Sequence, residues 1–267
     1  MGNAEPIGDG AHVVRPGGVC VMDTRVDQVT MEGAVNYIAS LMSEGRFSYS
    51  VTPNVDHLVK LRHDPEFREA YGAADLAVAD GVPLVWASRL LGSPLPERVN
   101  GTDLMVRLAA MAAINDYSVY LLGGAPGTAE AAARLLQDRY DGLRIAGHSC
   151  PPVGFDQESE TNDLLVESVA ASGADILFVA LGAPKQEKWI HFYGERTGVR
   201  HAIGIGGSFS LITGQIRRAP RWAQRAGLEW AWRFAHEPSR LWRRYLIDDL
   251  PFLRYLAKLV VQSRFRR

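Results

Sequence analysis

Polar side chains follow two consecutive predicted strands in the first third of the chain. Thr52 and Asn54 lie at the end of the β-prone run 48–52, and Asp80 comes directly after the apolar run 76–79. In an open parallel sheet, ligands bind beyond the carboxyl ends of the strands. We therefore expect Thr52, Asn54 and Asp80 to share one edge of a sheet. A carboxylate there can act as a general base, because it can accept a proton from a substrate hydroxyl.

Asp80 also has a purely structural interpretation. A helix is predicted over residues 82–91, and an aspartate just before a helix can accept hydrogen bonds from its first amides. A capping carboxylate has a lowered pKa and is therefore a poorer base. The residue types and their spacing favour the two roles about equally.

The elements that must position these residues alternate between strand and helix as far as residue 214. Around Asp80 the pattern is a strand at 48–52, one helix over 57–74 and a strand at 76–79. Further strands are predicted at 118–122, 144–147, 175–181 and 201–205, and residues 19–23 are predicted as a first strand or an edge element. Further helices are predicted at 30–43, 103–115, 129–140, 162–172 and around 186–192. Thr102 or Asp103 is the expected cap of the helix over 103–115. This alternation predicts an α/β fold of Rossmann type, with a largely parallel sheet covered by helices on both faces.

Gly123 and Gly124 stand between the strand at 118–122 and the helix over 129–140. Glycines in such a turn let the backbone approach a phosphate, and the dipole of the following helix favours an anion. The spacing departs from the usual dinucleotide-binding pattern. A tight turn between strand and helix explains it equally well.

Composition sets the class of protein. The chain has 267 residues, 47% of them hydrophobic, which suits one α/β domain with an appendage or two small domains. Its two cysteines, Cys20 and Cys150, form no disulfide framework and lack the spacing of metal ligands, so we expect a reducing compartment. Residues 1–18 are predicted to be disordered. The first ten residues lack the basic and apolar regions of a signal peptide.

A charge asymmetry separates the last fifth of the chain from the rest. Residues 215–267 hold 12 Arg and 1 Lys against 2 Glu and 2 Asp, a formal charge of +9. The preceding 214 residues hold 16 basic and 26 acidic residues, a formal charge of −10. A tail this basic needs an anionic partner, which can be a nucleic acid, a phosphorylated substrate or a membrane surface.

The tail also carries four of the six tryptophans, interleaved with Arg233, Arg240 and Arg243. We expect two or three short helices, and residues 246–261 contain too many charges for a transmembrane span. Aromatic and arginine side chains on short amphipathic helices suit a membrane interface. A basic helical subdomain that only packs on the core fits the pattern equally well. We therefore divide the chain into a disordered segment 1–18, an α/β core 19–214 and a helical appendage 215–267.

Taken in order, these segments resemble the WecG/TagA/CpsF family of bacterial glycosyltransferases, glycosyltransferase family 26. The matching segments cover about residues 45–246, and their ordered set is specific although no single motif is. They are Thr52-Pro-Asn-Val-Asp56, Ala79-Asp80-Gly81, Arg98-Val-Asn-Gly-Thr-Asp103, Leu122-Gly-Gly124, Leu181-Gly-Ala-Pro-Lys-Gln186, Gly204-Ile-Gly-Gly-Ser208, Arg218-Ala-Pro-Arg-Trp222, Gly227-Leu-Glu-Trp230 with Arg233, Glu237-Pro-Ser-Arg240 and Trp242-Arg243-Arg244.

The resemblance implies an inverting sugar transfer. The family moves a sugar from a UDP-sugar to an undecaprenyl-diphosphate-linked sugar, usually N-acetylglucosamine, at the cytoplasmic face of the membrane. Its donors carry N-acetylmannosamine, the corresponding uronic acid or another hexose, and its products include teichoic acids and exopolysaccharides. We thus expect a peripheral membrane enzyme whose partners are a UDP-sugar, a polyprenyl-diphosphate-linked sugar and the membrane surface. A homo-oligomer and a monomer are both open alternatives.

The same resemblance assigns roles to individual residues. Asp80 matches the family's proposed base, Thr52 would lie beside the sugar or acceptor, and Gln186 would lie near the donor sugar. Thr52 as a turn residue and Gln186 as a polar residue in the first turn of a helix are the structural alternatives. The substrate-binding residues expected from the matching segments are Asn54, Gly81, Asn100, Asp103, Gly123, Gly124, Arg233, Arg240 and Arg243. Asn100 and Asp103 need no such function if they are only a capping pair.

The departing UDP needs a positive partner. Many glycosyltransferases hold a divalent metal with an Asp-x-Asp motif, and this sequence contains none. We therefore expect no metal cofactor, with the charge supplied by Arg, Lys or helix amides. Arg233, Arg240 and Arg243 match the family's appendage arginines and are the candidates.

Two other classes of function remain. A nucleotide-sugar-binding protein without transfer would use the same pocket, with the tail as a docking surface. A nucleic-acid-binding protein would stack bases on the tail's aromatic residues. The acidic core and the absence of a recognised nucleic-acid-binding motif in the sequence argue against the second class.

Overall fold

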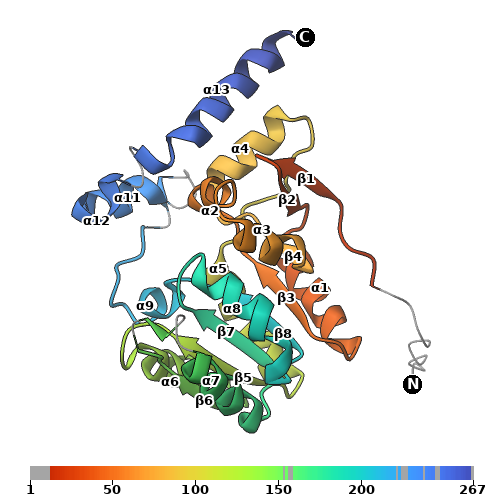
Figure 1. The fold of residues 1–267 in the computed structure, drawn as a ribbon, viewed down its shortest axis with the longest axis vertical. Helices are drawn as coiled ribbons and strands as arrows, with labels where there is room; N and C mark the ends of the chain where they lie inside the picture. Colours follow the sequence, from red (N-terminus) through yellow and green to blue (C-terminus); the bar gives the residue numbers. More distant parts are fainter. Residues whose placement is uncertain are drawn as a thin grey trace.

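The computed structural model describes residues 13–152, 154–155, 159–220, 222–223, 228–236, 238–243 and 247–265. Residues 1–12 of the segment that we expected to be disordered lie outside this range. At the centre is a six-stranded parallel sheet in the order β4-β3-β8-β7-β5-β6 (Figure 1). Its strands are β3 (Ser48–Val51), β4 (Leu76–Ala77), β5 (Ser118–Gly123), β6 (Arg144–Ser149), β7 (Ile176–Ala180) and β8 (His201–Gly204). The Rossmann-like α/β fold predicted from the sequence is confirmed.

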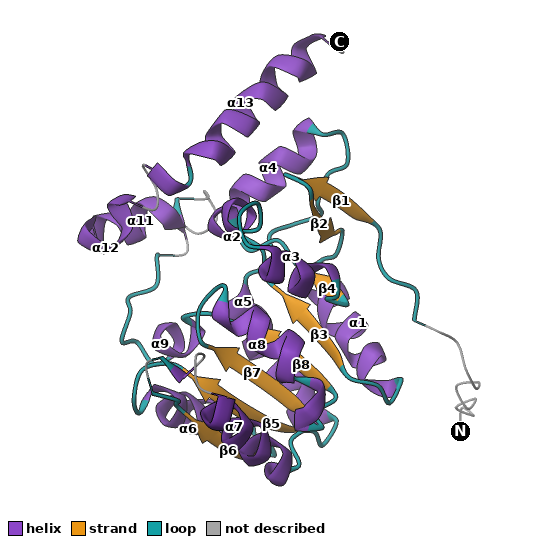
Figure 2. Ribbon diagram, in the orientation of Figure 1, coloured by secondary structure: helices purple, strands orange, loops and turns teal. Residues whose placement is uncertain are grey.

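Helices cover both faces of this sheet (Figure 2). Alternate strand residues point to opposite faces, so Val119 and Leu121 of β5 enter one core and Tyr120 and Leu122 the other. The first core is closed by α1 (Met31–Ser43), α5 (Gly101–Ile114), α6 (Thr128–Arg139) and α9 (Ser208–Ile212). The second is closed by α2 (Val55–Lys60), α3 (Pro65–Gly72), α7 (Ser159–Ser172) and α8 (Lys185–Tyr193). The short η2 (Glu195–Thr197) follows α8, and α4 (Val82–Leu90) follows Asp80.

The single helix predicted over 57–74 is wrong, because two helices occupy this stretch. Helix α2 ends at Lys60 and α3 begins at Pro65, with Asp64 as its N-cap accepting from the Phe67 amide over 3.0 Å. Proline lacks an amide proton and its ring clashes with the carbonyl four residues earlier, so it favours the first turn of a new helix. The hydrophobic periodicity continues across the break between the two helices, so periodicity alone does not reveal it.

The strand predicted at 19–23 pairs outside the main sheet. It is β1 (Gly18–Val21), which forms an antiparallel hairpin with β2 (Thr24–Asp27), a strand that the sequence did not suggest. Asp27 at its end is buried, forms ion pairs with Arg15 and Arg25, and accepts from the Ala77 amide over 2.8 Å. The hairpin thereby covers part of the open edge of β4, which is a normal way to protect an edge strand. The predicted strand 76–79 is shortened to Leu76–Ala77 in the sheet.

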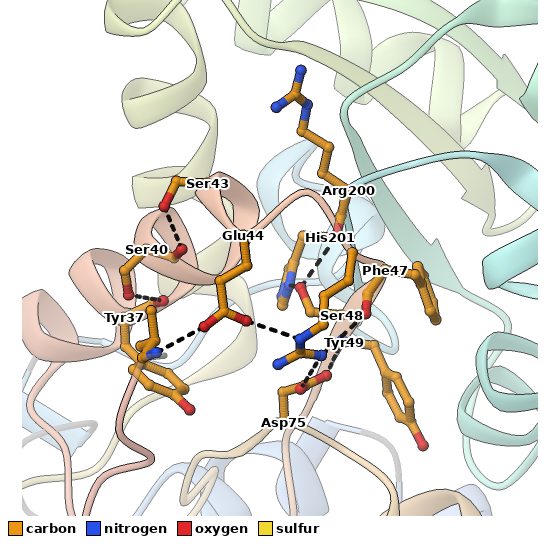
Figure 3. Close-up of polar contacts among 12 residues, drawn as sticks. Tyr37, Ser40, Ser43, Glu44, Phe47, Ser48, Tyr49, Asp75, Arg200 and His201 are labelled. Atoms are coloured by element: carbon orange, nitrogen blue, oxygen red, sulfur yellow. Dashed lines mark hydrogen bonds and ion pairs between the residues drawn. The ribbon is translucent and has the colours of Figure 1, made fainter. Parts of the chain in front are cut away.

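The amino ends of the strands are fixed by two similar aspartates. Asp75, just before β4, accepts from the Tyr49 amide over 2.9 Å and pairs with Arg46 at 2.7 Å (Figure 3). Asp175, just before β7, accepts from the Ser118 amide over 2.9 Å and pairs with Arg200 at 3.0 Å. Both satisfy backbone donors at the end of the sheet opposite to Asp80.

A buried histidine joins the neighbouring strands β3 and β8 at the same end of the sheet. His201 of β8 is fully buried, and one of its ring nitrogens lies 2.8 Å from Ser48 Oγ of β3 (Figure 3). The other ring nitrogen lies 2.9 Å from Ser50 Oγ of the same strand. Burial lowers the pKa of His201 to about 3. The ring is therefore neutral at physiological pH, and it serves to link the strands through hydrogen bonds.

The tail forms α11 (Glu229–His236), α12 (Pro238–Arg243) and α13 (Leu250–Phe265). Helix α13 lies beside α4 and α2 (Figure 1), with Phe252 and Leu259 buried in the second core. Three tail tryptophans, Trp222, Trp230 and Trp242, are 63%, 48% and 47% exposed. Within the described residues, no helix combines the length and the apolar character that crossing a bilayer requires.

Candidate active site

Asp80 lies at the carboxyl edge of the sheet, where the sequence placed it. Its amide donates to the Pro53 carbonyl over 2.9 Å, which ties it to the loop after β3. Its half-buried carboxylate lies 3.3 Å from Asn100 Nδ2 and 3.4 Å from the Gly101 amide, at the start of α5. Asp80 is not the N-cap of the following helix, because Gly81 has that position in α4.

Thr52 and Asp80 lie near the same residue, Gly101, at the start of α5. A Cβ built on Gly101 would lie 3.6 Å from Thr52 Oγ1 and 3.7 Å from Asp80 Oδ2, so both side chains border the same backbone position. Thr52 Oγ1 donates to the Gly204 carbonyl at the end of β8 over 3.2 Å. The hydroxyl and the carboxylate thus lie close together at the edge, as the sequence predicted, and a shared substrate stays a prediction.

Gln186 lies against Gly204, the residue whose carbonyl accepts the bond from Thr52. It is 1% exposed, and a Cβ on Gly204 would lie 2.8 Å from its Nε2. Its Oε1 accepts from the Gly182 amide over 3.2 Å and from the Gly206 amide over 3.0 Å. In this arrangement Gln186 supports two loops of the site from beneath, and any contact with a sugar stays a prediction.

Asn100, Asn54 and Asp103, the other polar residues expected from the motifs, each have a structural role as a helix cap or an ion-pair partner. Asn100 caps α5, accepting from the Thr102 and Asp103 amides over 2.9 and 3.1 Å, which confirms the capping alternative for Asn100. The expected cap at Thr102 or Asp103 is wrong. Asn54 caps α2. Asp103 pairs with Arg218 at 2.6 Å. Asn100 additionally touches Asp80, so its cap also positions the candidate base.

A cavity of about 340 Å³ opens farther along the same edge. It is lined by Gly124, Ala125, Ala180, Leu181, Gly182, Gly206, Gly207, Phe209 and Ser210. It lies beyond the carboxyl ends of β5 and β7, where one connection leads through α6 to β6 and the other through α8 to β8 on the opposite face. Ligands bind at such switch points of α/β sheets.

Gly123 lets β5 approach β7 closely at Ala180, which lines the cavity. Its φ is +101°, and a Cβ there would lie 2.6 Å from the Ala180 carbonyl oxygen. Gly124 donates its amide to the same carbonyl over 2.8 Å and lines the cavity. Gly124 therefore borders the cavity and Gly123 lies next to it in the chain, and the phosphate-binding role expected for both stays a prediction.

The three candidate arginines of the tail fall on two helices. Arg233 belongs to α11, and Arg240 and Arg243 to α12. The side chains of Arg233 and Arg240 lie outside the described residues. The Arg243 side chain is 75% exposed, and its guanidinium lies 3.9 Å from the Asp248 carboxylate.

Two ion pairs that the sequence did not suggest tie the tail to the edge beside Asp80. Arg98, just before α5, pairs with Glu229 of α11 at 2.7 Å, and the second pair is Arg218 with Asp103. The pKa of Arg218 is raised, chiefly by its hydrogen bond to Asp103. Both arginines stand in the matched motifs, but residue type alone does not reveal a partner more than a hundred positions away.

Glu187 was also missed. It is fully buried directly beside Gln186 and accepts from Gln186 Nε2 over 2.8 Å. Helical periodicity offered a signal: both residues fall three or four positions before the buried Ile190, so they share its inward face.

A parallel sheet with polar groups at its carboxyl edge and a glycine-lined cavity is an architecture that binds nucleotides and other small ligands. A sequence profile of the Glycosyl transferase WecG/TagA/CpsF family matches residues 19–266. The chain therefore belongs to this family, and the resemblance noted from its motifs is confirmed.

Three relatives carry the name N-acetylglucosaminyldiphosphoundecaprenol N-acetyl-beta-D-mannosaminyltransferase. The chain is 34% identical to that of Bacillus spizizenii over 206 residues, 77% of each chain. It is 31% identical to that of Bacillus subtilis over 183 residues, 68% of this chain and 69% of the relative. It is 29% identical to that of Staphylococcus aureus strain MRSA252 over 242 residues, 89% of this chain and 91% of the relative.

Proposed function

We propose that the protein is an inverting glycosyltransferase that moves a sugar, N-acetylmannosamine in the first instance, from a UDP-sugar to an undecaprenyl-diphosphate-linked sugar. The names of the three relatives support both the transferred sugar and the acceptor. The observation that carries the proposal is the position of Asp80. It stands at the carboxyl edge beside Thr52, on the same edge as the glycine-lined cavity.

In the proposed reaction, Asp80 accepts the proton of the acceptor hydroxyl. The hydroxyl oxygen attacks the anomeric carbon, and the bond from that carbon to the diphosphate oxygen breaks. UDP leaves with the electron pair, and the configuration at the anomeric carbon inverts. Asn100 and the Gly101 amide hold the carboxylate in place for this step.

The cavity is the proposed place for the donor nucleotide. Its lining is rich in glycine backbone, which allows close approach of a diphosphate, and it neighbours the loops held by Gln186. No metal is required in this proposal, since the negative charge that develops on UDP would be met by arginines of the tail. Arg243, with its exposed guanidinium, is available for that role, and Arg233 and Arg240 join it by their motif positions.

We propose further that the tail docks on the inner face of the cell membrane, where a lipid-linked acceptor lies. The formal charge of +9 over residues 215–267 and the exposed tryptophans support this placement. The pairs Arg98–Glu229 and Arg218–Asp103 would then connect the docked tail to the edge that carries Asp80.

The test is UDP release from a panel of UDP-sugars, with a short-chain prenyl-diphosphate N-acetylglucosamine as acceptor. We expect acceptor-dependent release with UDP-N-acetylmannosamine. Asp80→Asn should lower kcat roughly 10²- to 10⁴-fold, because the base is lost, while UDP binding measured by calorimetry stays within a few-fold of wild type. UDP binding by the wild type without release from any donor would instead identify a nucleotide-sugar-binding protein.

A further inference from the structure

One buried amide joins two loops that line the cavity. Gln186 Oε1 accepts from the amides of Gly182 and Gly206, and both glycines border the cavity. The side chain has no room to move toward β8, because Gly204 already lies against its Nε2. The relative position of the two loops therefore depends on the orientation of this amide. We call Gln186 with its two backbone bonds the glutamine clamp.

Glu187 selects the orientation of the glutamine clamp. An amide group has nearly the same shape when flipped by 180°, so its hydrogen-bond partners decide which way it points. Gln186 Nε2 donates to Glu187 Oε1 over 2.8 Å. A flipped amide would direct its NH₂ group at two backbone donors and its oxygen at a carboxyl oxygen. Only the observed orientation satisfies all of these partners.

The placement of Glu187 is costly for a group with no role beyond packing. It is 0% exposed, and Oε2 makes no hydrogen bond within the part of the chain that the structure describes. Burial raises the pKa of Glu187 to about 7, and the bond from Gln186 offsets this only in part. The titratable groups that face it are Asp56 and Lys60 of α2 and Tyr71 of α3. Buried carboxyl groups with an unpaired oxygen are rare in proteins, and they are found mainly at functional sites.

We propose that Glu187 is a positioning residue for the donor site: its carboxyl group fixes the Gln186 amide, which in turn holds the loops at Gly182 and Gly206 in the geometry that receives the donor. The proposal rests on the proposed function, in which the donor occupies the cavity. Glu187 acts through Gln186 and does not itself touch the substrate.

Two substitutions of similar size separate this role from packing. Glu187→Gln keeps an oxygen that can accept from Gln186 Nε2, whereas Glu187→Leu fills the space and accepts nothing. The leucine variant leaves Nε2 unpaired and opens both amide orientations. We expect it to lower kcat/KM for the UDP-sugar by roughly tenfold to a hundredfold, as a small displacement of positioning groups does. The glutamine variant should remain within about threefold of wild type by the same reasoning.

The direct test is amide hydrogen exchange at Gly182 and Gly206 in the full-length protein. This measurement reports on the glutamine clamp whether or not sugar is transferred. Glu187→Leu should accelerate exchange at both glycines by roughly tenfold or more, since their shared acceptor is no longer held. Glu187→Gln should leave both close to wild type. Ile190→Ala is the matched control, because Ile190 is fully buried on the same helix and its truncation destabilises the fold by opening a cavity.

Ile190→Ala should lower the melting temperature without selectively accelerating exchange at the two glycines. Wild-type exchange at both glycines in Glu187→Leu would overturn the proposal. So would equal acceleration in Glu187→Leu and Ile190→Ala, because a general loss of stability would then account for it. A wild-type protein that transfers no sugar but shows the expected exchange pattern would overturn the proposed function alone.

Discussion

At the scale of single residues, two buried titratable groups should give the protein opposite responses to pH. Glu187 has a folded-state pKa of about 7 against an ordinary value of 4.5, so the unfolded chain releases its proton first as pH rises. Its contribution to stability is present below pH 4.5 and is lost as pH rises to about 7. The loss is on the order of 3 kcal/mol, since each pKa unit corresponds to about 1.4 kcal/mol.

Glu187→Gln removes this titration. We expect the variant to gain stability relative to wild type between pH 5 and pH 8, as measured by urea unfolding at several pH values. The buried amide cannot ionise, so its free energy of unfolding should not fall through that window on its own account. A constant difference between the two proteins from pH 5 to pH 8 would contradict the raised pKa.

His201 should act in the other direction. Its folded-state pKa is about 3 against an ordinary value of 6.5. Between these two pH values the histidine is protonated in the unfolded chain and neutral in the folded chain. The contribution of His201 to the stability of the fold is therefore present above pH 6.5. It is lost as pH falls toward 3, by on the order of 5 kcal/mol. His201→Gln can still bond Ser48 and Ser50 but does not titrate. Its unfolding free energy should fall less steeply than wild type between pH 6.5 and pH 4, and an identical slope would refute this account.

At the scale of elements, two helix caps of the same kind have different consequences. Asn100 caps α5 and Asp64 caps α3, each with a side-chain oxygen on a backbone amide. Replacement of either by Ala should cost about 1 kcal/mol of stability, measured by denaturant unfolding. Asn100 also donates to Asp80, whereas Asp64 pairs with Lys188 on the surface of α8.

We therefore expect Asn100→Ala to lower sugar transfer by roughly tenfold or more, because the candidate base loses a positioning partner, and Asp64→Ala to leave transfer near wild type. The two variants should lose a similar amount of stability, but only Asn100→Ala removes a contact with Asp80. If both variants transferred sugar equally well, the Asn100–Asp80 contact would have no part in the reaction.

At the scale of the whole molecule, the tail divides into a part that packs and a part that faces outward. Phe252 and Leu259 of α13 are buried against α4 and α2, while Trp222, Trp230 and Trp242 are exposed. We expect the triple replacement of these tryptophans by Ser to weaken binding to anionic phospholipid vesicles, measured by co-sedimentation, without a change in the melting temperature. Wild-type binding should weaken as salt increases, because basic residues supply part of the attraction.

Transfer to a water-soluble, short-chain acceptor should survive this triple replacement, since the tryptophans contact the bilayer in our proposal and not the reacting groups. Wild-type vesicle binding by the variant would remove the tryptophans from membrane docking. Loss of transfer to the soluble acceptor would show that they belong to the site itself.

The sequence by itself determined the α/β fold, the edge position of Asp80 and Thr52, and the family. These follow from local signals: apolar runs, glycine turns and ordered motifs. Periodicity failed at Pro65, where two helices share one hydrophobic pattern, and in β2, which has no apolar run of its own. Only the tertiary structure showed that Asn100 holds Asp80, that Glu187 orients Gln186, and that Arg98 and Arg218 tie the tail to the core. Except for the adjacent pair Glu187–Gln186, these contacts join residues 20 or more positions apart, and even that pair depends on burial. Hydrogen bonds and buried charges depend on which atoms meet in space, and one sequence specifies that only through the complete fold.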